Sequence, residues 1–149
     1  MSLRKTVLFD IDGTLADIAH RRPYLQSDRP DWKRFNDGMG DDTPNTAIVS
    51  LYKTLRQSEA YELILVSGRS EQYRSITQHW LTWNEIQFSR LLMRKENDVH
   101  SDVIIKEEIL HKLLSEGLQI EFVVDDRQQV VDMWRRNGIT CLQCDVGDF

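Results

Sequence analysis

Short apolar runs alternate along the chain with longer segments in which apolar residues recur every three or four positions. The runs have the length of buried strands, and polar residues or turn signals bound them. Between the runs, the three-to-four spacing predicts helices. Alternating strands and helices indicate an α/β fold with a mainly parallel sheet covered by helices on both faces. The expected strands are residues 6–9, 61–66, 88–93, 120–124 and 139–143.

Four helices are expected between these strands. The first begins at Thr43-Pro44, because threonine is a frequent N-cap and proline is frequent at the first helical position. The next two open at Ser70 and Ser101, and the last ends at Asn137-Gly138, a strong C-terminal signal. The apolar face expected on the first helix consists of Ile48, Leu51, Tyr52 and Leu55.

Residues 15–42 break this alternation. They include Trp32 and Phe35, within a short helix expected near residues 30–37, and a loop rich in glycine and aspartate. The segment follows the carboxyl end of the first strand, where ligands bind in open α/β sheets. We therefore expect a small lid that contacts the substrate, within a single domain of residues 1–149. The segment is too short for an independent cap domain.

Three of the predicted strands are followed at once by chemically active residues. The segments are Asp10–Thr14, Ser67–Arg69 and Asp125–Arg127. Neighbouring strand ends lie side by side in a parallel sheet, so these side chains should converge. Several carboxylates at one point repel one another, and a divalent cation relieves that repulsion. Oxygen ligands favour Mg²⁺, so the sequence predicts a magnesium site that includes Asp10, Asp12, Asp125 and Asp126.

The most specific motif is Asp-Ile-Asp-Gly-Thr at the end of the first strand. A carboxylate can act as a nucleophile that accepts a phosphoryl group. Gly13 permits a sharp turn off the strand, and Thr14 can bind a phosphoryl oxygen or cap that turn. An isolated Asp-Gly is usually only a turn. The two matching strand ends further along the chain favour phosphoryl chemistry here.

The segment Val-Leu-Phe-Asp-Ile-Asp-Gly-Thr-Leu resembles the first motif of the haloacid dehalogenase (HAD) superfamily of phosphotransferases. Ser67, Lys106 and Asp125-Asp126 match the second, third and fourth motifs in the same order. The resemblance covers essentially the whole chain. It implies a Rossmann-like, HAD-type sheet flanked by helices, with the small insert in place of a cap domain.

A further set of segments resembles the 3′-phosphatase half of bacteriophage polynucleotide kinase/phosphatase. It comprises Val-Ser-Gly-Arg, Asp-Val-Ile-Ile-Lys-Glu-Glu-Ile, the block from Asp125 to Gly138 and a final Gly-Asp-Phe. The resemblance implies a Mg²⁺-dependent phosphomonoesterase that removes 3′-phosphate from DNA or RNA ends. No Gly-x-x-x-x-Gly-Lys-Ser/Thr motif occurs, so a kinase or ligase is expected only as a separate partner.

The same resemblance assigns roles to the acidic residues. Asp10 is the expected nucleophile, which forms an aspartyl-phosphate, and Asp12 is the expected general acid and then general base. An acid requires a raised pKa, which neighbouring carboxylates favour and a metal opposes. Mg²⁺ would be held by Asp10, the Asp12 carbonyl and the fourth-motif pair, in which Asp126 is the expected direct ligand.

Basic and small residues complete the expected site. Arginine presents a planar fork of donors that suits phosphate, and lysine offsets the substrate's charge. Asp102 is expected to support Lys106, and Arg127 to brace the aspartate loop. The expected phosphate-binding residues are Thr14, Arg21, Ser67, Gly68, Arg69 and Lys106.

Two other functions remain open from the residues. The enzyme could instead hydrolyse mononucleotides or other small phosphate esters. A receiver-like signalling domain, or another non-catalytic phosphate-binding module, also combines acidic residues with serine and lysine on an α/β sheet. A receiver carries its phosphoacceptor at the end of a middle strand, where this chain has Ser67, so that hypothesis is weaker.

Composition and charge exclude several classes of protein. The 24 acidic and 19 basic residues give a net charge of −5, which argues against a general nucleic-acid coat and favours a local grip on the terminal phosphate. No apolar stretch is long enough for a membrane span, and no signal peptide is evident. We expect a cytoplasmic protein of a bacterial or phage-infected cell. Cys141 and Cys144 lack a second cysteine pair, so we expect one of them to pack in a terminal strand and the other to be incidental.

Overall fold

A five-stranded parallel sheet forms the centre of the molecule. The computed structural model describes residues 4–147, so Asp148 and Phe149 of the final motif lie outside the described residues. All four pairings between neighbouring strands are parallel, as predicted. The order across the sheet is β5 (Arg90–Arg94), β4 (Tyr61–Ser70), β1 (Lys5–Phe9), β6 (Ile120–Arg127) and β7 (Cys141–Gly147).

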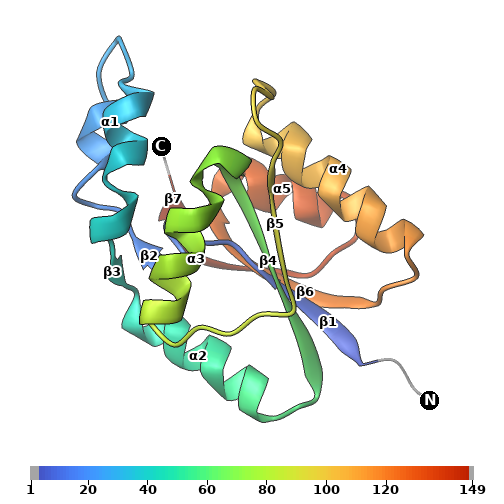
Figure 1. Cartoon of the computed structure of the whole chain (residues 1–149). Coiled ribbons are helices and arrows are strands. Elements are labelled where there is room, and N and C mark those ends of the chain that lie inside the picture. The colour runs from blue at the N-terminus through green and yellow to red at the C-terminus, as the bar shows by residue number, and fades with distance from the viewer. Residues whose placement is uncertain (1–3, 148–149) are drawn as a thin grey trace.

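The predicted helices cover both faces of this sheet (Figure 1). The helices α2 (Thr46–Gln57) and α3 (Arg74–Trp83) pack on one face, and α4 (Asp102–Ser115) and α5 (Gln128–Arg136) pack on the other. A short 3₁₀ turn, Glu71–Tyr73, precedes α3. No helix within residues 4–147 is both long enough and apolar enough to cross a membrane.

The central strand β1 is buried on both faces. Val7 and Phe9 belong to the core under α2 and α3, whereas Leu8 belongs to the core under α4 and α5. Phe9 meets Tyr52 of α2 edge-on, with the ring centres 4.9 Å apart. On the other face, Trp134 of α5 is completely buried. This double burial explains why the sequence of β1 is a continuous apolar run rather than an alternating one.

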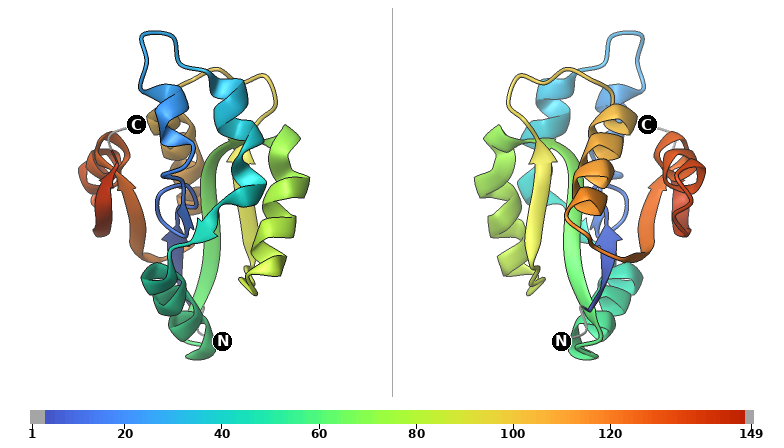
Figure 2. Two further views of the ribbon diagram at one scale, coloured as in Figure 1. Left: turned by 90° about the vertical axis from the view of Figure 1, so that its left-hand side faces the viewer. Right: turned by 90° about the vertical axis from the view of Figure 1, so that its right-hand side faces the viewer.

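The insert between β1 and α2 folds into short elements above the carboxyl edge of the sheet (Figure 2). The predicted short helix is present as α1, and the side chain of its N-cap, Asp31, accepts a hydrogen bond from the Arg34 amide at 3.1 Å. The elements are β2 (Ala16–Asp17), η1 (Arg22–Leu25), α1 (Trp32–Asp37), η2 (Met39–Asp41) and β3 (Thr43–Pro44).

The expectation that Thr43-Pro44 begins a helix is wrong. These residues form β3, which pairs antiparallel with β2 and closes the insert. The helix α2 begins only after Asn45, whose amide donates to the Leu15 carbonyl at 2.8 Å. The expected apolar face of α2 is confirmed for Ile48, Tyr52 and Leu55, which pack on the core, but Leu51 is exposed and Val49 is buried in addition. Pairing within the insert therefore overrides the local helix-start signal.

Burial of β1 gives a direct prediction for stability. Leu8 is fully buried in the centre of the sheet, so Leu8→Ala should lower the free energy of unfolding by about 2–5 kcal/mol. Leu142 on the edge strand β7 is 48% exposed, and Leu142→Ala should change it by less than about 1 kcal/mol. Urea unfolding followed by circular dichroism measures both. Equal losses in the two variants would contradict the assigned core.

Candidate active site

The three strand ends that carry the motif residues are neighbours in the sheet. Since β4, β1 and β6 are adjacent and parallel, Ser67, Asp10 and Asp125 lie at one edge. Among the described residues, Asp10, Asp125 and Asp126 form a buried cluster, in which each offers a carboxylate oxygen within 4.8 Å of the others. We call these three residues the acidic cluster. Its existence follows from the parallel topology.

Lys106 partly neutralises the acidic cluster. Its ammonium reaches in from α4 and bonds Asp10 Oδ1 at 2.8 Å and Asp125 Oδ2 at 3.0 Å. Burial lowers the pKa of Lys106, but the charges of Asp10 and Asp125 outweigh this and raise it above its usual value. Burial and the charge of Asp125 raise the pKa of Asp10 well above its usual range, and raise that of Asp126 to about 6. The cluster therefore holds more negative charge than one ammonium balances.

Asp126 has an oxygen that is available to a ligand. Both Asp125 oxygens accept hydrogen bonds: Oδ2 from Lys106 and from the Trp134 indole at 3.1 Å, and Oδ1 from the Asp126 amide at 2.8 Å. Asp126 Oδ2 is buried and accepts no hydrogen bond from the residues that the structure describes. The Arg22 guanidinium approaches it only to 4.0 Å. A buried carboxylate oxygen of this kind, beside two further carboxylates, fits a divalent cation.

Glycines let the chain pass close to this oxygen. A Cβ at Gly13 would lie 2.1 Å from Asp126 Oδ2, and one at Gly147 would lie 2.5 Å from it. Gly13 also has a positive φ of 82°, which a glycine adopts without strain. The glycine of the Asp-x-Asp-Gly-Thr motif therefore serves both the turn and the close approach of β6.

The side chain of Asp12 does not join the acidic cluster, which corrects the expectation of four converging carboxylates. Its Oδ1 accepts from Arg21 at 2.6 Å and from Arg69 at 2.7 Å. Burial raises the pKa of Asp12, but the charges of Arg69 and Arg21 outweigh it and hold this pKa below its usual range. The neighbours of Asp12 are thus cations, not the expected carboxylates. A metal contact from Asp12 is left to its backbone carbonyl.

Asp42 completes this second group of charges, and sequence reasoning missed it. Asp42 is buried and accepts from the Arg21 Nε and Nη2 atoms at 2.7 and 2.6 Å, while Arg69 approaches it at 3.4 Å. The indole of Trp80 donates to its carbonyl at 2.8 Å. We call Asp12, Arg21, Asp42 and Arg69 the arginine–aspartate network. Nothing in a Gly-Asp-Asp loop marks the second aspartate as a partner of residues so distant in sequence.

The two arginines occupy different positions. Arg21 is fully buried, and its third donor group bonds the Phe35 carbonyl at 3.1 Å. Arg21 is therefore placed behind Asp12 rather than at the expected phosphate position. Arg69 lines the main cleft together with Asp10, Asp12 and Lys106. Only Arg69 of this pair faces the space that a substrate would enter.

Small residues of the motifs hold the loops around the cluster. The Thr14 hydroxyl donates to Asp10 Oδ2 at 2.9 Å, and Ser67 Oγ accepts from the Arg69 amide at 3.1 Å. A Cβ at Gly68 would lie 2.5 Å from Asp102 Oδ1, so glycine permits the close approach of α4. Thr14 and Ser67 are both buried beside the cleft floor.

Asp102 joins the ends of three elements. It accepts from Arg94 at 2.5 Å and from Arg127 at 2.8 Å, which connects α4 with β5 and β6. Arg94, which sequence reasoning also missed, donates to the Gly68 carbonyl at 2.8 Å and to two carbonyls of the loop 95–101. Asp102 therefore supports the site through these arginines, and its charge further raises the pKa of Lys106.

The cleft above the acidic cluster has a volume of about 630 Å³. Its floor comprises Asp10, Asp12, Arg69 and Lys106, and its sides come from α1 and from the loop 95–101. Figure 2 shows both of these segments at the same end of the sheet. The converging carboxylates, cations and backbone turn are what a phosphate-handling site requires.

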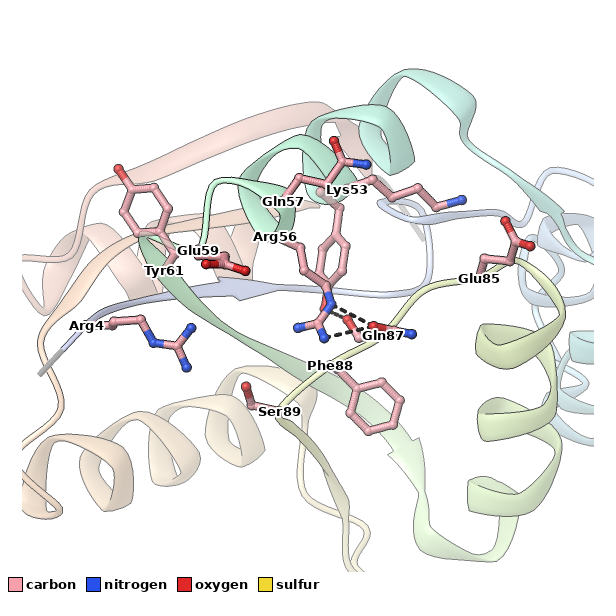
Figure 3. Close-up of a pocket in the computed structure, with 11 residues that line it drawn as sticks. Arg4, Lys53, Arg56, Gln57, Glu59, Tyr61, Glu85, Gln87, Phe88 and Ser89 are labelled. Atoms are coloured by element: carbon pink, nitrogen blue, oxygen red, sulfur yellow. Dashed lines mark hydrogen bonds between the residues drawn. The ribbon is translucent and has the colours of Figure 1, made fainter.

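A second hollow, of about 920 Å³, lies at the amino ends of β1 and β4 (Figure 3). Arg4, Lys53 and Arg56 contribute positive charge, and Glu59 and Glu85 contribute negative charge. Arg56 donates to the amide oxygen of Gln87, drawn as dashed lines in the figure. This hollow brings no carboxylate cluster together and belongs to the opposite end of the sheet from the motifs.

The two cysteines are free thiols on β7. Cys141 is buried in the core under α4 and α5, as expected for a packing residue. Cys144 packs beside the catalytic turn, with its sulfur 3.6 Å from Thr14 Oγ1. Burial raises the pKa of each thiol to about 12, so neither is a reactive thiolate.

The fold is that of the HAD superfamily. A solved structure of a haloacid dehalogenase-like hydrolase from Streptococcus pneumoniae matches with a TM-score of 0.65 at 18% identity, over 94% of this chain and 84% of that chain. At this identity the match establishes the fold alone. The residues that match the HAD motifs lie at the carboxyl ends of β1, β4 and β6 and near the start of α4. They are the Asp-x-Asp-Gly-Thr turn, Ser67, Asp125-Asp126 and Lys106.

The chain belongs to the family described as "Polynucleotide kinase PNKP phosphatase domain", whose model matches residues 4–149. It is therefore a phosphatase domain of the HAD type. It is similar to chains in two solved structures of a Pnkp1/Rnl/Hen1 complex, one of them described as an RNA repair complex. The identities are 38% and 39%, and the TM-scores are 0.84 and 0.82. The matches cover 99% of this chain but only 44% and 48% of those chains.

The arginine–aspartate network predicts a large effect at Asp42. Asp42→Asn removes a buried charge that neutralises Arg21, so it should lower the free energy of unfolding by roughly 2–4 kcal/mol. The matched control is the exposed neighbour Asp41, where Asp41→Asn should change it by less than about 0.5 kcal/mol. Chemical denaturation measures both variants. A loss at Asp42 no larger than at Asp41 would contradict the network.

Proposed function

We propose that the protein is a Mg²⁺-dependent phosphomonoesterase that removes 3′-phosphate from polynucleotide ends through an aspartyl-phosphate at Asp10. The observation that carries the proposal is the environment of Asp10. This carboxylate lies at the cleft floor, receives hydrogen bonds from Lys106 and Thr14, and belongs to an acidic cluster that fits a divalent cation. Membership of the PNKP phosphatase-domain family supports the same chemistry.

Asp10, the Asp12 carbonyl and Asp126 are the proposed Mg²⁺ ligands. Asp126 provides an oxygen that makes no hydrogen bond, whereas Asp125 is engaged by Lys106 and Trp134 and orients the cluster. Bound Mg²⁺ would offset the charge of the carboxylates and polarise the phosphoryl group. Carboxylate and carbonyl oxygens are the donors that this ion prefers.

The proposed reaction has two steps. In the first, an Asp10 oxygen forms a bond to phosphorus, the bond from phosphorus to the 3′ oxygen breaks, and Asp12 donates a proton to that oxygen. In the second, Asp12 accepts a proton from water, whose oxygen attacks phosphorus and releases inorganic phosphate and free Asp10. Lys106, which bonds Asp10, and Arg69, which lines the cleft, are the proposed contacts of the phosphoryl oxygens. Ser67 is proposed as a third contact.

The arginines around Asp12 keep its carboxylate ionised, which is the form that a general base requires, but they also lower its proton affinity. Its role as an acid requires the substrate. Arg69 lines the cleft, so a phosphate dianion that binds there places negative charge beside the same guanidinium that Asp12 uses. That charge opposes the field of the arginines and raises the proton affinity of Asp12. We infer that substrate binding itself prepares Asp12 for the first step.

The nucleic-acid substrate is supported by the comparisons and by the cleft. The similar chains with the higher identities come from structures named for Pnkp1/Rnl/Hen1, which favours RNA ends as one substrate. The phosphate-loop motif of a kinase is absent from this sequence. We propose that a kinase or a ligase acts on the ends that this enzyme produces, in the cytoplasm of a bacterial or phage-infected cell.

Loss of the nucleophile tests the mechanism. Asp10→Asn should lower phosphate release by at least about a thousandfold, because an amide oxygen does not form the covalent intermediate. Asp17→Asn, at an exposed residue of the same insert, should retain the wild-type rate. Phosphate release from 3′-phosphorylated RNA and DNA oligonucleotides is the measurement. A near-normal rate for Asp10→Asn would overturn the assignment.

The same assay separates the two substrate classes. Matched 3′-phosphorylated oligonucleotides and 3′-mononucleotides should be compared by kcat/KM with the wild-type protein. We expect the oligonucleotides to be the better substrates. Higher kcat/KM for the mononucleotides would establish the alternative, a small-molecule phosphatase, with the chemistry at Asp10 unchanged.

The acidic cluster predicts a pH effect that the metal should remove. The pKa of Asp126 is about 6 in the folded protein, above its value in the unfolded chain, so without metal this group destabilises the fold as pH rises from about 4 to 6. In EDTA the protein should therefore be more stable near pH 5 than near pH 7. Saturating MgCl₂ should reduce that difference, and Asp126→Asn should reduce it in EDTA. Thermal unfolding measures the stability at each pH. A stability difference between pH 5 and pH 7 that neither MgCl₂ nor Asp126→Asn reduces would contradict this prediction.

A further inference from the structure

The cleft is much larger than a phosphate group. Its volume of about 630 Å³ is in the range of pockets that hold drug-sized ligands. The polar floor around Asp10 and Lys106 accounts for only part of its surface. Above that floor the sides carry apolar groups, with Trp32 and Phe35 on α1 and Val99 in the loop 95–101.

Trp32 offers a large aromatic surface at the rim of this cleft. It is 54% exposed. Its ring contacts the buried Phe35 edge-on, with the ring centres 5.7 Å apart. An edge-on contact of this kind covers at most one face of Trp32, so Phe35 leaves at least one face of the indole uncovered. Its place on the first turn of α1 keeps it beside the cleft and not in the core.

The side of the cleft that carries Trp32 is connected to the arginine–aspartate network. The Arg21 guanidinium carbon lies 4.5 Å from the centre of the Phe35 ring, and an Arg21 nitrogen donates to the Phe35 carbonyl at 3.1 Å. The same guanidinium bonds Asp12. The position of Trp32 is thus set, through one packed aromatic and one buried arginine, relative to the proposed acid and base.

Hydrogen bonds from Arg94 fix the loop 95–101 on the opposite side of the cleft. Arg94 donates to the carbonyls of Asp98 and His100 and to the Asp102 carboxylate, which joins the loop to the start of α4. Val99, within that loop, is 93% exposed and lines the cleft. The cleft therefore has an aromatic side on α1 and an opposite side that is mostly polar, with Val99 as its apolar residue.

We propose that this space binds the base of the 3′-terminal nucleotide, with Trp32 as its stacking surface, so that the enzyme acts on unpaired 3′ ends. The inference rests on the proposed polynucleotide phosphatase function. A terminal phosphate at Asp10 brings the attached nucleoside to the mouth of the same cleft. Every nucleobase has a π-face, so such stacking is tolerant of sequence. A base that stays paired at a duplex end offers only its outer face and carries its partner base with it, so it enters the cleft and stacks on Trp32 less freely than an unpaired base.

The net charge of the protein increases the importance of base stacking on Trp32. A net charge of −5 provides little attraction for phosphates further along the strand, so the terminal nucleotide must supply much of the recognition. Stacking of one base on an aromatic side chain is worth roughly a tenfold change in affinity or more. Trp83 at the end of α3 is 81% exposed but does not line the cleft, and it supplies a matched control.

The test compares two single-stranded oligonucleotides that share the same 3′-phosphate, one of which ends in an abasic residue. Wild-type kcat/KM should be about tenfold lower or more for the abasic end. Trp32→Ala should lower kcat/KM for the normal end by a similar factor, chiefly through KM, and should add little further loss on the abasic end. Trp32→Phe should retain most of the wild-type difference in kcat/KM between the normal and the abasic end. Trp83→Ala should behave as the wild-type protein on both ends.

A third substrate tests the unpaired-end requirement. A blunt duplex that carries the same 3′-phosphate should be a poorer substrate than the single strand, and Trp32→Ala should narrow that gap. Equal effects of Trp32→Ala on the normal and abasic ends would overturn the inference while phosphate release continues to support the proposed function. Hydrolysis of p-nitrophenyl phosphate without release from any oligonucleotide would overturn both.

Discussion

Buried negative charge at the carboxyl end of β1 is the constraint on which the whole site depends. Five aspartates, Asp10, Asp12, Asp42, Asp125 and Asp126, lie in this region, and burial makes each unneutralised charge costly. The structure meets this cost in two separate groups. The arginine–aspartate network pairs two carboxylates with two guanidinium groups. The acidic cluster pairs three carboxylates with one ammonium, so charge balance there calls for a divalent cation.

This division gives the two aspartates of one motif opposite environments, although only one residue separates them. Burial and the neighbouring carboxylate of Asp125 raise the pKa of Asp10, whereas the charges of two arginines outweigh burial and lower the pKa of Asp12. Pairs of carboxyl groups in unlike surroundings are a general means of dividing nucleophilic and acid–base work. Here the turn at Gly13 and the insert produce the division, because the insert supplies Arg21 and Asp42 to Asp12 alone.

Features encoded locally could be predicted from the sequence. The strands are continuous apolar runs because both faces of the sheet are covered, and parallel topology then brings the motif residues together. Asp42 and Arg94 could not be predicted, since their roles depend on partners that only the folded chain brings near. The start of α2 was misplaced because β3 pairs with β2, and antiparallel pairing within the insert outweighs a local N-cap signal at Thr43-Pro44.

The insert is therefore more than a cover over the sheet. Arg21 connects it to the chemistry, since this one buried guanidinium bonds Asp12, Asp42 and the carbonyl of Phe35. A displacement of α1 would move Phe35 and disturb the cation beside Asp12, and the electrostatics of that carboxylate would change with it. The proposed stacking surface and the proposed acid and base are thus parts of one packed unit. Within the described residues, one short insert would in this way couple substrate recognition to acid–base chemistry.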